Sequence, residues 1–255
     1  MALNMNQNSA KNLVKRNEGG GPSISYSKDH RSVQGMFSKI APRYDLLNTV
    51  LSFGIHHLWQ KRAFALLPET EEWSVLDLCT GTGALIEPLT RRFKRVIGAD
   101  FALPMLQAGK AKGVSPKAIL CQADALNLPF ESGVFDLVTV AYGVRNFEDL
   151  QSGLAEIHRV LRPGGSLLIL EFGQPTNWLW RWVYGFYSRC VLPVLGGAIS
   201  GEKQAYSYLQ KTASQFPCGP AFEEILSQAG IKPLQTKALN VGIAFAYLGV
   251  RDGVA

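Results

Sequence analysis

The chain has 255 residues, of which 47% are hydrophobic, and its formal net charge is +6. This length is enough for one α/β domain with additional segments, and the composition excludes a disordered chain. No run of 18 apolar residues occurs, which excludes an integral membrane protein, and the four cysteines lack C-x-x-C spacing, so a reduced, cytoplasmic setting without a metal is expected. The positive charge fits nucleic acid, an anionic membrane surface or no particular partner, and does not choose among them.

Residues 1–32 are predicted to form a tail without a fixed fold, because they are poor in apolar residues and rich in Asn, Ser and Lys. They have neither the apolar core of a secretory signal nor the arginine density of a mitochondrial presequence, so no export is expected. Residues 33–67 differ, since apolar residues recur there at helical intervals and Pro42 suits a helix start or break. This segment is predicted to be a helical cap that precedes the sheet.

A strand, a tight loop and a helix are predicted in succession after this cap. The strand covers residues 75–78, the loop covers 79–83, and the helix begins at Ala84. Gly81 and Gly83 permit backbone angles that other residues avoid, and they carry no side chain that would block a ligand. The main chain of the loop can therefore contact a nucleotide.

An acid at the end of the next strand extends this prediction. A second, mostly apolar strand over residues 95–99 is followed by Asp100, where a carboxylate can accept hydrogen bonds from both hydroxyls of a ribose. Ile86 stands where the dinucleotide fingerprint needs a third glycine, which disfavours a dehydrogenase. Asp77 adds a carboxylate before the loop, and no Arg or Lys within residues 73–90 offsets the charge of a phosphate, so a cationic nucleoside fits better. An ordinary strand, turn and helix is the alternative.

The loop resembles a motif of one class of enzymes. The pattern Asp77-x-Cys79-x-Gly81-x-Gly83 is similar to motif I of class I S-adenosylmethionine-dependent methyltransferases, with Cys79 where many members have glycine. The resemblance implies S-adenosylmethionine as the cofactor. Together with the motif described next, it implies a cofactor site made of Asp77, Gly81, Thr82, Gly83, Asp100, Phe101, Asp124, Ala125 and Ala141.

The third and fourth strands are predicted over residues 118–123 and 135–141, after a helix over 103–112. Asp124 and Ala125 follow the third strand and resemble acidic motif II of the methyltransferases. In that motif the carboxylate accepts a hydrogen bond from the adenine amino group, and a small residue leaves room for the ring. Asp124 as the cap of a turn is the alternative interpretation.

Two further segments resemble the signatures of the ubiquinone and menaquinone biosynthesis C-methyltransferase family. The first contains Tyr44-Asp45-Leu46-Leu47-Asn48 and then Leu51, Ser52, His56 and Trp59, with Leu47 in place of the usual Met. The second extends from Arg159 to Glu171, with Arg162 in place of the usual Lys, and is followed by Gly173 in place of Ser. The resemblance covers residues 33–250. A histidine such as His56 that merely packs or faces solvent is the alternative for that residue.

Later segments complete a doubly wound, mostly parallel α/β sheet of seven strands, the last of them reversed as in this family. They are a helix over residues 148–161 stopped by Arg162-Pro163-Gly164-Gly165, a strand over 166–172, a helix over 221–229, and strands over 233–239 and 242–250. The domain is predicted to span residues 33–255.

Residues 174–220 form an insertion that is too long for an ordinary connection. Aromatic residues crowd its first part from Trp178 to Tyr187, and residues 191–199 carry no charge. A helix pair packed on the domain's own core and a lid over a lipid substrate are both open. The residues of its later part that resemble family positions are Tyr206, Tyr208, Leu209, Phe216 and Pro217, which we expect at the rim of the pocket. The uncharged run 190–201 is too short to span a membrane.

The family resemblance implies C-methylation of a prenylated quinol, with demethylmenaquinol favoured and the benzoquinol of the ubiquinone pathway open. The ring carbon must attack a sulfonium methyl group, which requires alignment, a proton acceptor and exclusion of water. Arg145 is expected to orient a water or stabilise the phenolate, and Asn146 to fix the arginine or the cofactor. Tyr142, Asp45 and His56 are candidates for handling the proton.

The expected partners are the quinol and, transiently, the inner face of the cell membrane, which the aromatic stretch would contact peripherally. A homodimer is left open. A small-molecule O- or N-methyltransferase would share the cofactor motifs without the two signatures. A nucleic-acid methyltransferase should carry a motif such as Asn-Pro-Pro-Tyr where this chain has Tyr142-Gly143-Val144-Arg145, so no nucleic acid is expected. A non-enzymatic membrane-binding protein is disfavoured by the cofactor motifs.

Overall fold

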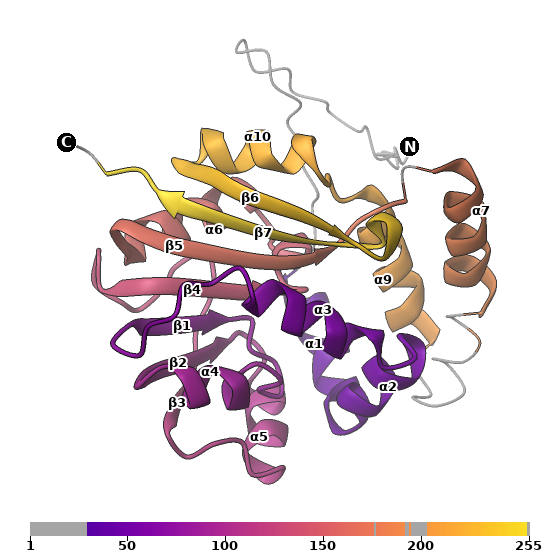
Figure 1. Ribbon diagram of the computed structural model, residues 1–255. Helices are drawn as coiled ribbons and strands as arrows, with labels where there is room; N and C mark the ends of the chain where they lie inside the picture. Colours follow the sequence, from indigo (N-terminus) through magenta and orange to yellow (C-terminus); the bar gives the residue numbers. More distant parts are fainter. Residues whose placement is uncertain (1–29, 176, 192–193, 195–202, 254–255) are drawn as a thin grey trace, which may run out of the picture.

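The computed structural model describes residues 30–175, 177–191, 194 and 203–253. Its centre is a seven-stranded sheet in the order β3-β2-β1-β4-β5-β7-β6 (Figure 1). Strands β1 to β5 pair in parallel, whereas β7 is antiparallel to both of its neighbours, so the predicted sheet with a reversed last strand is confirmed. The strands are β1 Ser74–Leu78, β2 Arg95–Asp100, β3 Ala118–Gln122, β4 Phe135–Ala141, β5 Leu161–Phe172, β6 Ile231–Leu239 and β7 Ala244–Arg251.

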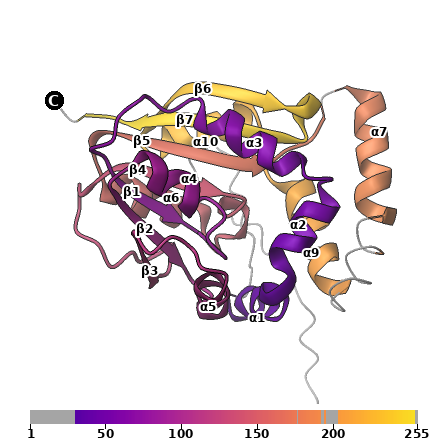
Figure 2. The same ribbon diagram turned by 60° about the horizontal axis from the view of Figure 1, so that its bottom comes forward.

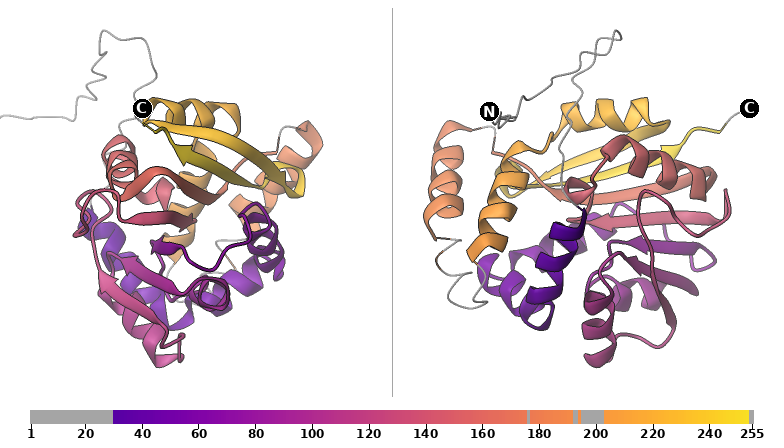
Figure 3. Two further views of the ribbon diagram at one scale, coloured as in Figure 1. Left: turned by 60° about the vertical axis from the view of Figure 1, so that its left-hand side comes forward. Right: turned by 180° about the vertical axis from the view of Figure 1, so that it is seen from behind.

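Helices cover both faces of this sheet (Figure 3). Phe222 of α10 is buried on the face that also holds α6, and Trp59 of α3 is buried on the opposite face with α4. Leu137 and Val138 of β4 are fully buried on opposite faces, as predicted for a parallel strand covered on both sides. The helices of this core are α3 Ile55–Phe64, α4 Ile86–Arg92, α5 Leu103–Ala111, α6 Leu150–Val160 and α10 Pro220–Gln228.

The predicted helical cap is present at the carboxyl ends of the parallel strands. It consists of α1 His30–Ile40, a short 3-10 helix Ala41–Arg43 that contains Pro42, α2 Tyr44–Leu51 and then α3. Helix α1 begins three residues before the predicted start of the cap at 33; the rest of the predicted tail lies outside the described residues. Figure 2 shows α1 and α2 beside the helices of the insertion, at the end of the molecule away from the C-terminus.

The start of β5 differs from the prediction. The strand begins at Leu161 instead of 166, because Leu161 pairs with Phe135 and the ladder continues from Ser166 after a register shift. The Arg162-to-Gly165 segment, which was expected only to stop a helix, is an irregularity inside the strand, with Gly164 at a φ of +73°. Two glycines in sequence therefore mark a bulged strand start as well as a helix end.

The insertion contains two described helices, α7 Trp178–Phe186 and α9 Lys203–Gln215, with a π-helical turn Tyr187–Val191 after α7. Helix α7 stands at the edge of the molecule beyond the ends of β5 and β6 (Figure 1). None of its residues is buried. Most of the uncharged run 190–201 lies outside the described residues, so the prediction for that run is not addressed by the structure.

Candidate active site

A cavity of about 530 Å³ lies between the carboxyl ends of the central strands and the helices of the cap and the insertion. This volume is within the range of small-molecule sites, roughly 300–1,000 Å³. Its lining is mainly apolar and aromatic, with a few polar groups from the loop after β1, from the segment after β4 and from α3. Among the predicted site residues it is lined by Asp45, His56, Asp77, Gly81, Thr82, Ala141, Tyr142 and Arg145.

A smaller cavity of about 90 Å³ lies beside it, between α1 and the ends of β1, β2 and β4. The predicted cofactor residues that line it are Gly81, Asp100, Phe101, Ala125 and Ala141. The two cavities share six lining residues: Phe37, Tyr44, Cys79, Gly81, Ala141 and Tyr142. A ligand in the small cavity and a ligand in the large cavity would therefore meet at this common wall.

The loop after β1 has the backbone geometry that its sequence predicts. Gly81 and Gly83 have φ values of +59° and +82°. Cys79, which stands where the motif usually has glycine, is also at positive φ, +57°, a conformation that costs a non-glycine residue roughly 1–2 kcal/mol. The loop thus keeps the glycine conformation at Cys79 without the glycine.

Gly83 and Asp124 line neither cavity. A side chain at Gly83 would come within 2.4 Å of Val114, so this glycine is required for packing. Asp124 Oδ1 accepts a hydrogen bond from the Leu126 amide at 2.9 Å, which is the turn cap that the sequence left as an alternative. A contact of either residue with the cofactor remains a prediction.

Two carboxylates lie beside the loop, and of these Asp77 is buried and Asp100 is half-buried. Asp77 accepts hydrogen bonds from Thr80 at 2.6 Å and Thr139 at 2.7 Å, and burial raises its pKa to about 6. Asp100 accepts from the amides of Gly81 and Ala102, both at 2.8 Å, and burial raises its pKa as well. Two acids with raised pKa values in one site indicate that a cation would stabilise them.

The cap is fastened to this loop through α2. Asp45 Oδ1 accepts a hydrogen bond from the Thr82 hydroxyl at 2.5 Å, and its other oxygen pairs with Lys112 at 2.5 Å. These contacts occupy the carboxylate that the sequence nominated for the proton, and also the hydroxyl of a predicted cofactor residue. Asp45 and Thr82 therefore join the cap to the loop in the described structure.

Arg145 is 4% exposed and forms an ion pair with Glu171, which is fully buried, at 2.7 Å. Its guanidinium also donates to the Tyr142 carbonyl and lies 5.1 Å from the centre of the Phe172 ring. The Nε atom is buried without a partner among the described residues. The sequence placed Arg145 at the crevice, but it did not indicate Glu171 as its partner, because the two residues are far apart in the chain.

Tyr142 and Asn146 complete this wall. The Tyr142 hydroxyl is buried without a partner among the described residues, and burial raises its pKa well above its usual value. Its backbone φ is +57°. Tyr142 is therefore suited to donate a hydrogen bond and poorly suited to accept a proton. Asn146 Oδ1 accepts from the Tyr208 hydroxyl at 3.2 Å, which connects the segment after β4 with α9.

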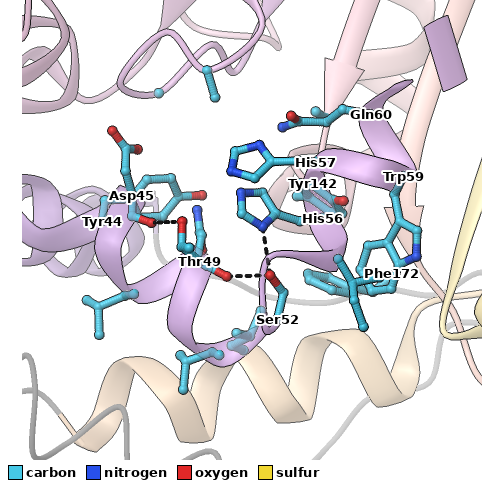
Figure 4. Close-up of a pocket in the computed structure, with 18 of the residues that line it drawn as sticks. Tyr44, Asp45, Thr49, Ser52, His56, His57, Trp59, Gln60, Tyr142 and Phe172 are labelled. Carbon is cyan, nitrogen blue, oxygen red and sulfur yellow. Dashed lines mark hydrogen bonds between the residues drawn. The ribbon is translucent and has the colours of Figure 1, made fainter. Parts of the chain in front are cut away.

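Helix α3 presents two histidines to the large cavity (Figure 4). The ring of His56 lies 3.8 Å from that of His57, and its Nδ1 is 2.7 Å from the Ser52 hydroxyl. Burial, followed by the neighbouring His57, lowers the pKa of His56, while Asp45 opposes this effect. Trp59, one turn further along, donates to Asn240 at 2.9 Å and holds the cap against the sheet.

Comparison with known proteins identifies the family. The model of the ubiE/COQ5 methyltransferase family matches residues 24–251. A demethylmenaquinone methyltransferase of Thermus thermophilus is 45% identical over 85% of this chain and 100% of its own length. The chain belongs to the ubiE/COQ5 methyltransferase family. A ubiquinone/menaquinone biosynthesis C-methyltransferase of Bdellovibrio bacteriovorus is 38% identical over 88% of this chain and 98% of its own.

Solved structures agree with this assignment at the level of the fold. A SAM-dependent methyltransferase of Thermotoga maritima has a TM-score of 0.61 at 19% identity, covering 86% of this chain and 99% of its own. A phosphoethanolamine N-methyltransferase of Haemonchus contortus, solved in complex with S-adenosyl-L-methionine, has a TM-score of 0.57 at 14% identity. The match covers 78% of this chain and 53% of the other. The family and the fold are therefore as the sequence predicted.

The outer wall of the large cavity comes from the insertion. Trp180, Val183 and Tyr184 of α7 line the cavity, and Tyr187 donates to the Leu51 carbonyl of α2 at 2.6 Å. The prediction of a lid is compatible with this placement of α7, which has no buried residue. Thr212 and Ala213 of α9 are buried, so the alternative of helices packed on the domain's own core stays open for that helix.

The predicted rim residues in the later part of the insertion were only partly placed correctly. Tyr208 and Leu209 of α9 line the large cavity, as expected for its rim. Phe216 does not, because it is buried in the main core against Phe222. Its placement at the rim was wrong. An aromatic residue just before a proline gives no local signal that separates a rim from a core position.

Among the described residues, no helix is long and apolar enough to cross a membrane. Within the same part of the chain, no cluster of His, Cys, Asp and Glu could hold a metal ion.

Proposed function

We propose that this protein transfers a methyl group from S-adenosylmethionine to a ring carbon of a prenylated quinol, with demethylmenaquinol as the substrate. The observation that carries the proposal is the pair of contiguous cavities with a shared wall, one beside the acidic loop after β1 and one large and apolar. The relatives named demethylmenaquinone methyltransferase support demethylmenaquinol as the ring that is methylated. The benzoquinol of the ubiquinone pathway is the second candidate, favoured by the relatives named for both pathways.

The small cavity lies where we place the nucleoside part of the cofactor. Ala125 and Ala141 leave room at the ends of strands, and the Asp100 carboxylate can accept further hydrogen bonds from ribose hydroxyls, since each oxygen has a second lone pair. The raised pKa values of Asp77 and Asp100 support a cationic ligand, because a nearby positive charge would favour their ionised forms. When bound, the cofactor supplies an electrophilic methyl group on a sulfonium.

The chain's own residues would serve the chemistry at the shared wall. Arg145 can stabilise a phenolate oxygen electrostatically, because its charge is held in a buried position by Glu171. Asn146 supports the same segment through Tyr208. Tyr142 has a buried hydroxyl, without a partner in the part of the chain that the structure describes, that can donate to the substrate oxygen. The apolar lining and the cap would exclude water and align the ring with the methyl group.

We also propose a transient, peripheral contact with the inner face of the cell membrane through α7. Trp178 is 76% exposed, Trp182 is 68% and Phe186 is 57%, while other residues of the same helix line the cavity. One helix thus faces the quinol site on one side and solvent on the other. A polyprenyl tail loses about 0.8 kcal/mol for each CH₂ exposed to water, so the enzyme must meet its substrate in the lipid. Arg181 and Arg189 can contact anionic headgroups there.

The test is methyl transfer from labelled S-adenosylmethionine to demethylmenaquinol in liposomes and to a tail-less analogue in solution. The wild type should methylate both at carbon, and a product methylated at oxygen or nitrogen would overturn the proposed function. Trp178→Ser with Trp182→Ser should weaken liposome binding and raise KM for the long-tailed quinol without changing activity on the analogue. The control is Ile119→Ser with Leu234→Ser, two comparably exposed apolar residues on the edge strands β3 and β6.

Equal loss of activity on both substrates, with liposome binding intact, would remove the membrane role from α7 and leave the methyl transfer proposal standing. A second copy of this chain on the same face would instead appear as a dimer in size-exclusion chromatography that the Trp178→Ser, Trp182→Ser variant abolishes. Binding of the wild type to liposomes as a monomer is the expected result.

A further inference from the structure

We propose that His56 is the proton acceptor for the quinol hydroxyl, and that Ser52 is a positioning residue that fixes which ring nitrogen of His56 is free to accept. This inference rests on the proposed function and names the group that prepares the ring for attack. His56 and Ser52 lie on the wall of the large cavity, four residues apart across the junction of α2 and α3 (Figure 4).

The hydrogen bonds of Ser52 determine the tautomer of His56. The Ser52 Oγ is 2.6 Å from the Asn48 carbonyl oxygen and 2.7 Å from His56 Nδ1. A serine hydroxyl has a single hydrogen, and a carbonyl oxygen can only accept. If that hydrogen pointed to His56, two oxygen acceptors would face each other at 2.6 Å with no hydrogen between them. The hydroxyl therefore donates to Asn48, and Nδ1 of His56 donates to Ser52.

This arrangement leaves Nε2 of His56 as the acceptor. In a neutral imidazole one nitrogen carries the hydrogen and the other a lone pair, so a protonated Nδ1 requires an unprotonated Nε2. His56 makes no second side-chain hydrogen bond among the described residues, so no protein group there competes for that lone pair. The same cavity wall includes Asp77 and Cys79 at the cofactor loop, which places the acceptor in one space with the methyl donor site.

The surroundings keep the imidazole neutral. Burial lowers the pKa of His56, and the adjacent His57 lowers it further, against a weaker effect of Asp45. Asp45 is itself paired with Lys112. Other groups that line the cavity are less suited, since the pKa values of Tyr44, Tyr142, Tyr184, Tyr187 and Tyr208 are raised by burial and a guanidinium does not deprotonate. The remaining titratable or charged lining residues are His57, Asp77, Cys79 and Arg145.

Proton transfer to His56 precedes the transfer of the methyl group. The hydroxyl proton of the quinol passes to Nε2, and its bonding pair raises the electron density of the ring. The ring carbon then forms a bond to the methyl carbon while the carbon–sulfur bond breaks, and that electron pair stays on sulfur. The hydrogen on the attacked carbon then leaves as a proton, and the ring oxygen takes up one proton in its place, which restores the aromatic hydroquinol. One proton is therefore released overall, and it is the one that His56 accepted and passes to solvent between turnovers.

The experiment uses the full chain with S-adenosylmethionine and a short-chain demethylmenaquinol. His56→Gln should lower kcat by about a hundredfold or more, as expected for loss of general base catalysis. Ser52→Ala should lower it less, because the imidazole remains but its tautomer is no longer fixed, and Ser52→Thr, which keeps the hydroxyl, should restore turnover. His158→Gln on α6, remote from the cavity, is the control and should match the wild type.

The pH profile supplies a readout that a merely structural role would not move. Because a protonated imidazole cannot accept, kcat of the wild type should fall at acid pH with a midpoint below the ordinary value of 6.5. Asp77, with a pKa of about 6, titrates in an overlapping range, so the limb belongs to His56 only if it disappears in His56→Gln. Addition of imidazole to His56→Ala should restore part of kcat.

Failure of the proposed function and failure of the His56 assignment would give different results. If the wild type does not methylate the quinol, or does not bind S-adenosylmethionine in calorimetry, the proposed function fails. If the wild type is active and His56→Gln turns over within threefold of it with an unchanged pH profile, the assignment of His56 is overturned while the function stands. Ser52→Ala with wild-type turnover and pH profile would overturn the positioning role of Ser52.

Discussion

The close approach of Cys79 and Gly143 gives a prediction that can be calculated from the structure. These residues lie after β1 and β4; Cys79 lines both cavities and Gly143 lines the small one. A Cβ added at Gly143 would lie 2.5 Å from Cys79 Cβ and 2.8 Å from its Sγ, with Val140 Cγ1 at 3.0 Å. The backbone of Gly143 has φ −107° and ψ −39°, which alanine can adopt. Gly143→Ala therefore tests packing alone.

Overpacking of this kind costs about 1–3 kcal/mol, so Gly143→Ala should lower the free energy of unfolding by that amount. Cys79→Gly should be close to neutral. It removes the cost of a side chain at a φ of +57°, roughly 1–2 kcal/mol, but adds about 0.5–1 kcal/mol of backbone entropy in the unfolded chain and loses some packing. In the double variant the nearest two of the three contacts are gone, so most of the cost of Gly143→Ala should disappear.

Urea denaturation of the wild type, both single variants and the double variant forms a double-mutant cycle. The expected coupling energy is about 1–2 kcal/mol, with the double variant more stable than additivity predicts. Gly35→Ala in α1 is the control, because nothing lies within 4 Å of its added Cβ, and it should leave stability unchanged or raise it. If Gly143→Ala destabilises equally with Cys79 and with glycine at 79, the reasoning about this contact is refuted.

Three further predictions concern the charged residues of the site. Asp100→Ala should weaken S-adenosylmethionine binding at least tenfold in calorimetry, because each hydrogen bond to the lost carboxylate contributes about 1.5–3 kcal/mol; unchanged affinity in a folded variant would contradict the assignment. Arg145→Lys should reduce turnover nearly as much as Arg145→Ala, because Nη1 bonds Glu171 and the Tyr142 carbonyl and lysine lacks the second guanidinium nitrogen that can hold a water or phenolate at the same time; turnover close to wild type would leave Arg145 a structural residue. The pKa of Asp77 is raised from 3.8 to about 6, so the stability that this group contributes is complete below pH 3.8 and is lost as the pH rises through 6. Asp77→Asn should therefore gain up to about 3 kcal/mol relative to the wild type between pH 4 and pH 7 in denaturant unfolding, and an equal difference at both pH values would show that the raised pKa is not the cause.

The sheet was largely predictable because its strands are continuous apolar runs bounded by turn residues. The predicted strand over 135–141 matches β4 Phe135–Ala141, and the helix over 103–112 matches α5 within one residue. The conformation of the loop after β1 was equally predictable, since the positive φ values of Gly81 and Gly83 depend on local backbone geometry alone. The position of Asp100 at the end of β2 was also predictable, because it directly follows a mostly apolar run.

Contacts between distant segments were not predictable. The partner of Arg145 is Glu171 on the next strand, and only the pairing of β4 with β5 brings them together. The early start of β5 depends on the same pairing. Phe216 gave no local sign that it would enter the core. The Ser52 bond to His56 was also missed, although both residues stand in the first signature, because it depends on the turn between α2 and α3.

The position of α1 has a consequence for the rate of turnover. Gln34 of α1 donates to the Phe101 carbonyl at 3.0 Å, and Phe37 of the same helix lines both cavities. The small cavity beneath them, about 90 Å³, is well below the roughly 300 Å³ at which ligand sites usually begin. A nucleoside bound there requires this space to widen, and α1 forms one of its walls. If α1 is the wall that moves, the exchange of spent cofactor for fresh includes a gating step, of the kind that limits kcat in many enzymes.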